Sequence, residues 1–317
     1  MVVSISPQTT TRKSMKKVHF MYVPFTGLGL QAGYRGRRWL KNRIRVFKQF
    51  VVPSLVNQSK KEFVIWCSWR EEDRGNKIIE ELERSLQGIR GMTAVFTYGG
   101  LCFWDDKYED EVAKQRLVTA LQNTLPELES YIPEDTERVY MTIQPSDDMY
   151  LGHVVEEIQE SEHIGVICYK QGYIINYANK EIADYDPTTN PPFFTIVFDR
   201  ERFLNPQEHL DFTGPYKSHE DIIKHVKSIT YKSDRAFVVG THGENISTTY
   251  NHPYRGRLLS EEERDAVLIK TGTLFSDTVV VRRGYRLLAR RVLNLLPFQD
   301  QIRYFYHNKL PLCLRLF

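Results

Sequence analysis

The apolar and polar positions in the first half of the chain follow two patterns, one typical of strands and the other typical of helices. Several short runs are rich in β-branched and aromatic residues, and the run over 62–68 is apolar nearly throughout, as in a parallel strand that is covered on both faces. They predict strands over residues 18–23, 62–68, 92–97 and 138–144. Apolar residues at helical spacing predict helices over 39–55, 77–87, 112–125 and 149–161, the third closed by Pro126. This alternation indicates an α/β fold with a doubly wound, mostly parallel sheet.

The second half of the chain has more strands and longer loops. Apolar runs predict strands over 164–170, 172–177, 194–198 and 236–240. A helix is predicted over 218–228 with Ser218 as its N-cap, and helices follow from Ser260 onward. We therefore expect the sheet to become mixed in this half and to be followed by a C-terminal helical appendage.

The helix predicted over 39–55 has a strongly basic side opposite its apolar residues. The basic positions in and just before it are Arg37, Arg38, Lys41, Arg43, Arg45 and Lys48. Runs of like charge are usually solvated faces, so we expect these side chains to lie in solvent.

Composition narrows the class of protein. Of the 317 residues, 41% are hydrophobic, which is ordinary for a globular protein. The net charge of +3 is too small to indicate nucleic-acid binding. The four cysteines form no CxxC pair, so neither a zinc site nor a disulfide framework is indicated. Residues 1–16 have the polar composition of a flexible tail, without the apolar core of a signal peptide or any membrane-spanning run. A cytoplasmic location is expected.

Two adjacent carboxylates, Asp147 and Asp148, follow the strand predicted over 138–144. Ligands of doubly wound sheets bind beyond the carboxyl ends of the strands, and paired acids there suit Mg²⁺ or Mn²⁺, which share their ligand shell with substrate phosphates. The alternative is a simple turn, because Pro145-Ser146-Asp147-Asp148 is also favourable turn chemistry.

Several segments, taken in order, resemble glycosyltransferases of the GT-A fold and, more narrowly, the putative rhamnosyltransferase family. The segments that carry the resemblance are Phe25-Thr26-Gly27-Leu28-Gly29 with Trp39 and Arg43, Pro53-Ser54-Leu55 through Trp66, Arg116, Ser146-Asp147-Asp148, and Thr241-His242-Gly243-Glu244-Asn245-Ile246-Ser247. The chain departs from the family at Pro145, where members usually have a further Asp, and this puts the strength of metal binding in doubt.

The resemblance implies a GT-A-like domain over 17–257, with a nucleotide-binding half and an acceptor half, and a helical extension over 258–317. It also implies transfer of a sugar from a nucleotide-sugar donor to a glycan or lipid-linked acceptor, with inversion at the reacting carbon. Rhamnose is one candidate for the transferred sugar. The metal, Mn²⁺ or Mg²⁺, would be held by Asp148 and Asp147, with His242 as a third ligand or a phosphate contact. The two aspartates are also expected to bind the donor, at its ribose or its phosphates.

The remaining chemistry needs a base for the acceptor hydroxyl and cations for the leaving diphosphate. For the base we favour Glu220 or Asp221 at the start of a predicted helix, although acids are common in first turns for electrostatic reasons alone.

Asp184 and Asp186 are rivals for catalysis or for acceptor binding. Arg70 and Arg116 are expected at the diphosphate, because arginine forks suit phosphate oxygens, and Trp69 is expected to stack on the base of the nucleotide.

The segment 282–317 interleaves arginines with leucines. It either packs its leucine face on the catalytic domain or makes a peripheral contact with an anionic membrane, which would place the protein at the inner face of the cytoplasmic membrane.

Two other functions compete with sugar transfer. A nucleotidyltransferase would use a similar sheet, but Thr26-Gly27-Leu28-Gly29 lacks the nearby basic residue of a phosphate loop. A carbohydrate-binding protein without catalytic activity could retain the same sheet, and Pro145 would then mark the lost acid.

Overall fold

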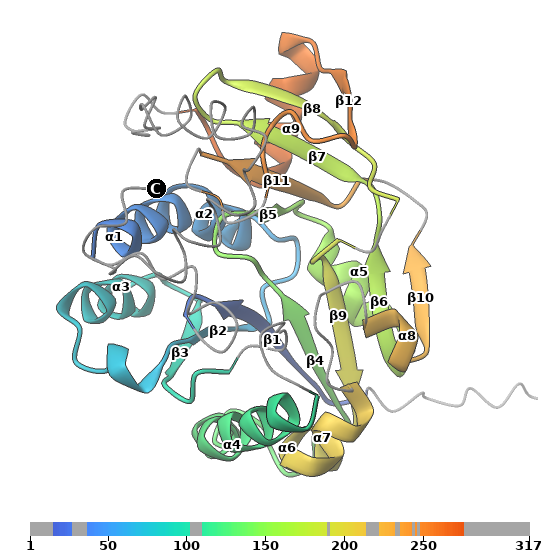
Figure 1. The fold of residues 1–317 in the computed structure, drawn as a ribbon. Helices are drawn as coiled ribbons and strands as arrows, with labels where there is room; N and C mark the ends of the chain where they lie inside the picture. The colour runs from blue at the N-terminus through green and yellow to red at the C-terminus, as the bar shows by residue number, and fades with distance from the viewer. Residues whose placement is uncertain are drawn as a thin grey trace, which may run out of the picture.

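The computed structural model consists of two β-sheets with helices packed around them (Figure 1). It describes residues 15–26, 37–101, 110–188, 191–213, 222–231, 235–242, 245 and 248–275.

The larger sheet has seven strands in the order β10-β6-β9-β4-β1-β2-β3. Its strands are β1 Lys17–Pro24, β2 Val64–Ser68, β3 Thr93–Thr97, β4 Arg138–Ile143, β6 Gly165–Tyr169, β9 Phe194–Phe198 and β10 Ser228–Tyr231. The first four run parallel to one another, whereas β9 is antiparallel to both of its neighbours, β4 and β6. The α/β prediction with a mixed sheet is confirmed.

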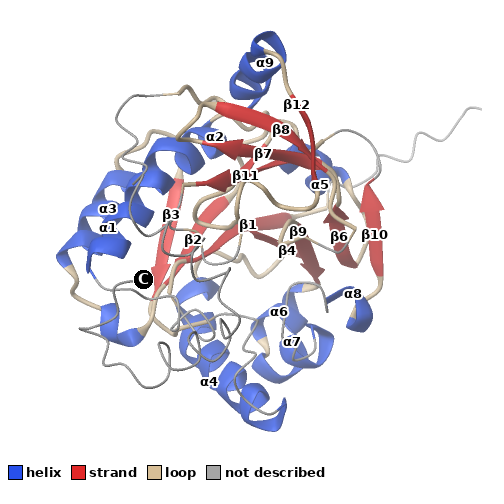
Figure 2. Cartoon of the chain, turned by 45° about the horizontal axis from the view of Figure 1, so that its top comes forward, coloured by secondary structure: helices blue, strands red, loops and turns tan. Residues whose placement is uncertain are grey.

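The smaller sheet has five strands in the order β12-β8-β7-β11-β5 and lies across the end of the larger one (Figure 2). Its strands are β5 Met149–Tyr150, β7 Gly172–Asn176, β8 Glu181–Tyr185, β11 Phe237–Thr241 and β12 Arg255–Leu258. Only five residues, 144–148, separate β4 in the larger sheet from β5 in the smaller one. The two acids predicted to form a site therefore lie where the chain passes from one sheet to the other.

Both faces of the larger sheet are covered, as its apolar strands require. Along β1, Met21 and Val23 belong to one hydrophobic core while Phe20 and Tyr22 belong to the other, which is the two-residue period of a strand. The first core is shared with α1 Arg37–Val46, η2 Phe47–Val51, α2 Val52–Val56, α3 Lys77–Gln87 and α5 Val154–Glu160. The second is shared with α4 Asp110–Glu129, α6 Arg200–Leu204, α7 Pro206–Thr213 and α8 Ile222–His225. A ninth α-helix in the described structure, α9 Glu261–Thr271, begins at the capping box of Ser260 and Glu263, and a short η3 covers Glu71–Asp73.

A buried polar network crosses the first core. The side-chain amide of Gln159 donates to Nδ1 of His19 at 3.1 Å, so Nε2 of His19 carries the proton and donates to Oγ1 of Thr142 at 2.7 Å. Thr142 in turn meets Thr195 at 2.6 Å. Burial lowers the pKa of His19 to about 3, so the neutral ring is the form that the fold holds.

Several predicted elements differ from the structure. The helix expected over 149–161 is wrong at its start, because Met149 and Tyr150 pair with β11 as strand β5 and the helix begins only at Val154. Helix α4 runs through Pro126 to Glu129 instead of closing there. Packing of Leu125 and Leu128 in the second core stabilises that last turn against the cost of a helical proline.

The runs 164–170 and 172–177 are strands, but β6 and β7 lie in different sheets. Strands β8, β10 and β12 were not predicted, and neither were helices α6 and α7. The boundary at residue 257 between a transferase domain and an extension stays a prediction.

Candidate functional site

The candidate site lies at the carboxyl end of β4, where the winding of the larger sheet changes direction. From β1 the chain winds outward through β2 and β3, and it then returns to place β4 on the opposite side of β1. In open α/β sheets, ligands bind in the crevice beyond the carboxyl ends of the strands at such a switch point. Asp147 and Asp148 follow β4 at this point.

Asp147 is the centre of a buried cluster drawn from three distant parts of the chain. Its Oδ2 forms an ion pair with the guanidinium of Arg43 on α1, whose side chain is only 4% exposed. The same oxygen accepts hydrogen bonds from Nε2 of His242 at 3.1 Å and from Nδ2 of Asn245 at 3.0 Å. Among the described residues, none donates to Oδ1 of Asp147, so this oxygen is left for another partner.

The cluster keeps Asp147 ionised. Burial alone would raise the pKa of this carboxyl, but the positive charge of Arg43 and the hydrogen bond from His242 outweigh it and lower the pKa to about 2.

Asp148 is held differently, by the backbone. Its Oδ1 accepts a hydrogen bond from the amide of Gly240 at 2.8 Å, and its carbonyl accepts one from the side chain of Gln144 at 2.8 Å. Burial and the neighbouring charge of Asp147 raise the pKa of Asp148 well above its usual range. The two adjacent acids therefore have opposite preferences, one for the charged form and the other for the neutral form.

Gly240 is required by the close packing of β11 against the acids. A Cβ at this position would overlap the carbonyl oxygen of Asp147 and would lie 2.9 Å from the hydroxyl of Tyr177. Only a glycine lets the two segments approach closely enough for the Gly240 amide to reach Asp148.

Four buried polar atoms around the cluster make no hydrogen bond within the described structure. They are Nε of Arg43, Oε1 of Gln144, the hydroxyl of Tyr177 and Nδ1 of His242. Buried polar atoms are nearly always satisfied, so a concentration of exceptions indicates atoms that are used by a ligand or by water. Tyr177 also stacks on Phe50 of the π-helical turn η2, with ring centroids 4.0 Å apart.

The predicted metal does not fit these residues as they are arranged. The described residues bring together no group of three His, Cys, Asp or Glu side chains that could hold a metal ion. Asp147 already has a cation, Arg43, and a divalent ion at Oδ2 would have to displace a buried guanidinium. Of the three predicted ligands, Asp147 and His242 do meet, whereas Asp148 bonds to the backbone of Gly240.

Two residues predicted to bind the donor have structural partners. The guanidinium of Arg70 makes a fork with Asp73, with both nitrogen–oxygen distances 3.1 Å, and the hydroxyl of Thr26 donates to Asp73 at 2.6 Å. Trp69 is fully buried and stacks on Phe25, with ring centroids 4.4 Å apart. This packing covers the ring, so we do not assign Trp69 to base stacking. Arg70 retains partial exposure near the carboxyl end of β2, and its role stays a prediction.

Arg116 lies on α4, which packs on the second core together with α6 and α7. Its contact with a donor stays a prediction. The two residues favoured as base, Glu220 and Asp221, and the segment 282–317 lie outside the described residues.

Asp184 and Asp186, the rival acids, form a network of ion pairs at the edge of the smaller sheet. Arg235 approaches Asp186 at 2.9 Å and Asp184 at 3.2 Å, and Arg257 lies 3.7 Å from Asp184. Their charges are thereby matched within the fold, and no contact within the described structure joins them to Asp147. Their roles in acceptor binding or catalysis stay predictions.

Arg43 is the main residue of the cluster whose place sequence reasoning missed. It was expected in solvent with the other cations of its helix, but it turns inward to Asp147. Its position one helical turn after the buried Trp39, whose ring the guanidinium approaches at 5.3 Å, is the signal that places it on the inner face.

Comparison with family models finds no match, and comparison with curated proteins finds none either. Among solved structures, the chain is similar to TarS of S. aureus (12% identity, TM-score 0.34), over 72% of this chain and 37% of that one. It is also similar to 4-diphosphocytidyl-2C-methyl-D-erythritol synthase from Anaerococcus prevotii (12%, 0.34, covering 80% and 94%) and to mouse xyloside xylosyltransferase 1 in its apo form (11%, 0.30, covering 61% and 68%). The chain thus spans little more than a third of TarS, and at these scores the likeness carries no argument about function.

None of the helices in the described part of the chain is long and apolar enough to cross a membrane.

Proposed function

We propose that this protein transfers a sugar from a nucleotide-sugar donor and that the donor binds at the Asp147 cluster. The observation that carries the proposal is the position of this cluster, in which a buried ionised carboxylate and several unsatisfied polar atoms lie at the switch point of the sheet. The resemblance of the sequence segments to the putative rhamnosyltransferase family supports sugar transfer over other uses of a nucleotide.

Each member of the cluster has a role that follows from its contacts. Oδ1 of Asp147 would accept a hydrogen bond from a ribose hydroxyl of the donor, while Arg43 fixes the orientation of the carboxylate through Oδ2. Nε2 of His242 contacts Asp147, and its unsatisfied Nδ1 would contact a phosphate group of the donor. These roles involve no metal ion, because the described residues do not fit one.

The acceptor would be a glycan or a lipid-linked sugar, and rhamnose is among the sugars that the resemblance implies. Its hydroxyl needs a base, for which Glu220 and Asp221 remain the first candidates and Asp184 and Asp186 the next. Inversion at the reacting carbon also rests on the resemblance alone.

The test is a screen of UDP-, GDP- and dTDP-linked sugars by thermal stabilisation and by release of nucleoside diphosphate. We expect one donor class to raise the melting temperature, because a ligand that binds only the folded state stabilises it. Release of inorganic pyrophosphate from a nucleoside triphosphate and a sugar phosphate would instead identify a nucleotidyltransferase. The absence of stabilisation by every donor would refute donor binding at this site.

The same screen with Asp147→Asn locates the donor. Loss of a charge-assisted hydrogen bond is expected to weaken donor binding by about 10- to 100-fold. Asp135→Asn is the matched control, because Asp135 is an exposed acid that pairs with Lys16 far from the cluster. Equal donor affinity in both variants would show that the donor does not bind at Asp147.

A further inference from the structure

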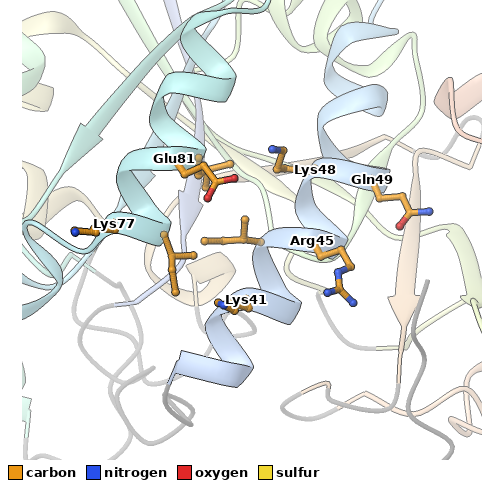
Figure 3. A pocket seen from close by; sticks show the side chains of 9 residues that line it. Lys41, Arg45, Lys48, Gln49, Lys77 and Glu81 are labelled. Carbon is orange, nitrogen blue, oxygen red and sulfur yellow. The ribbon is translucent and has the colours of Figure 1, made fainter. Parts of the chain in front are cut away.

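A second concave site lies on the outer side of the first helical layer, between α1–η2 and α3. Figure 3 shows basic side chains from both helices around this cleft. The cleft has a volume of about 550 Å³. Its floor is apolar and is formed by Ile44, Ile78 and Leu82, while its rim carries Lys41, Arg45, Lys48 and Lys77 with Gln49 and the single acid Glu81.

The four cations of the rim are exposed, and none forms an ion pair with another described residue. This differs from most arginines elsewhere in the described structure, which pair with carboxylates, as Arg74 does with Glu71 and Arg257 with Glu263. The cations of the cleft therefore keep their charge available for a partner outside the chain.

The spacing of these cations works against the helix that carries them. Lys41, Arg45 and Lys48 follow one another at intervals of four and three residues, so they form a stripe on one side of α1–η2. Like charges at this spacing destabilise a helix, and α1 contains no acid that could offset them. An arrangement that weakens its own helix is understandable if it serves binding.

The charge distribution of the chain favours the same interpretation. No aspartate or glutamate precedes Glu62, although the whole chain carries 40 acids against 43 lysines and arginines. The small net charge of the whole chain thus hides a segment, residues 1–61, in which every charged residue is basic. This segment includes α1 and η2. A basic segment of this kind attracts anions, and its apolar floor favours anions that carry a hydrocarbon part.

We propose that this cleft binds the phosphate headgroup of an anionic lipid, with the cationic rim on the phosphate and the apolar floor against the first carbons of its chains. The volume of the cleft is in the range of small-molecule sites, about 300–1,000 Å³, and so admits a headgroup and not only a flat membrane surface. Ile44 and Leu82 of the floor are buried, but Ile78 is partly exposed, and a phosphate without an apolar part would leave Ile78 in water. The proposal is independent of sugar transfer, because none of these residues belongs to the Asp147 cluster.

The test is co-sedimentation of the full chain with phosphatidylcholine vesicles that do or do not contain phosphatidylglycerol. Arg45→Gln with Lys48→Gln is expected to weaken binding to the anionic vesicles roughly 30-fold at low salt, which corresponds to about 1 kcal/mol for each charge. The control pair is Lys60→Gln with Lys61→Gln, which removes two charges from the same acid-free segment outside the cleft. For the control we expect less than about a threefold loss, because screening confines the effect of an exposed charge to its surroundings.

A further variant, Ile78→Ser, distinguishes a lipid from a free phosphate. This residue lies on the floor and is only partly buried, so the change removes apolar contact without changing the charge. It should weaken vesicle binding several-fold and leave the affinity for inorganic pyrophosphate unchanged.

Four results would overturn the proposal. The first two are equal losses of binding in the two double variants and equal binding to vesicles of phosphatidylcholine alone. The third is vesicle binding that survives Arg45→Gln with Lys48→Gln but is lost when residues 282–317 are removed. The fourth is vesicle binding that Ile78→Ser does not change. Circular dichroism melts that match the wild type would show that a loss of binding does not come from unfolding.

Discussion

The two sides of helix α1 use the same residue type for opposite purposes. Arg43 faces inward, is buried, and is paired with Asp147, whereas Arg45, two residues later, is exposed and unpaired within the described structure. The Arg43 side holds a site in shape, and the Arg45 side presents charge to a partner from outside. A basic helix in a sequence can therefore be a structural element and a binding surface at once, and only the partner of each side chain separates the two.

The largest expected effect is on the buried side. Arg43→Met should lower the free energy of unfolding by about 3–5 kcal/mol, because it leaves the buried carboxylate of Asp147 without its counter-charge. Arg45→Met, on the same helix, should change it by less than about 0.5 kcal/mol. Urea denaturation of the two variants measures the difference, and equal stabilities would show that the Arg43–Asp147 pair does not form in solution.

Gly240→Ala should also act on the buried side. The added Cβ would overlap the backbone of Asp147, and relief of that overlap should cost about 3 kcal/mol, the upper part of the usual range for overpacking. Donor binding should weaken with it, because the amide of Gly240 would move away from Asp148. Gly88→Ala is the control, since a Cβ there makes ordinary contacts, the nearest at 3.4 Å. Wild-type donor affinity in Gly240→Ala would separate the glycine from the site.

Acid should destabilise the fold through the buried network around His19. The pKa of His19 is lowered to about 3 in the fold and is near 6.5 when the chain is unfolded, so below pH 6.5 the unfolded state binds more protons. Stability should therefore fall as pH decreases from 6.5 towards 4, by about 1.4 kcal/mol per pH unit for this histidine. His209, whose pKa burial lowers to about 4, adds to the slope.

The measurement is urea denaturation across this pH range, with His19→Gln as the comparison. The variant should be less stable than the wild type at pH 7 but should lose less stability on acidification. Parallel pH profiles would show that His19 is accessible to protons in the folded state.

The smallest effect is expected on the exposed side. Arg45→Gln together with Lys48→Gln should leave stability unchanged or raise it by about 0.2–0.5 kcal/mol, because it relieves repulsion along the helix. Thermal unfolding at low and at high salt checks this, since salt should remove the gain. A clear loss of stability would mean that the rim cations have partners that hold the fold.

The strands and helices of the first half could be predicted because their burial follows a local period. The helix predicted over 77–87 is observed as Lys77–Gln87, and the four parallel strands lie where their apolar runs are. What could not be predicted depends on pairing between distant segments. Met149 and Tyr150 have the spacing of a helix start, but β11 captures them as a strand.

The candidate site shows the same limit. The acids at 147 and 148 could be located because they follow a strand, and His242 because it follows another. The sequence could not show that the positive charge beside Asp147 would come from Arg43 and not from a metal ion. The place of Arg43 one helical turn after Trp39 is a local signal for the inner face of α1, but that the inner face meets Asp147 depends on how α1 packs against the end of β4.

The cluster around Asp147 joins residues that lie far apart in the chain and are therefore synthesised at different times. Arg43 is synthesised early, its counter-charge Asp147 near the middle of the chain, and His242 and Asn245 only after most of both sheets has emerged. Until β11 inserts between β5 and β7, the guanidinium and the carboxylate lack the neighbours that bury them. During synthesis the site is therefore completed late, and a nascent chain interrupted before residue 237 would hold the acids without the strand that orders them.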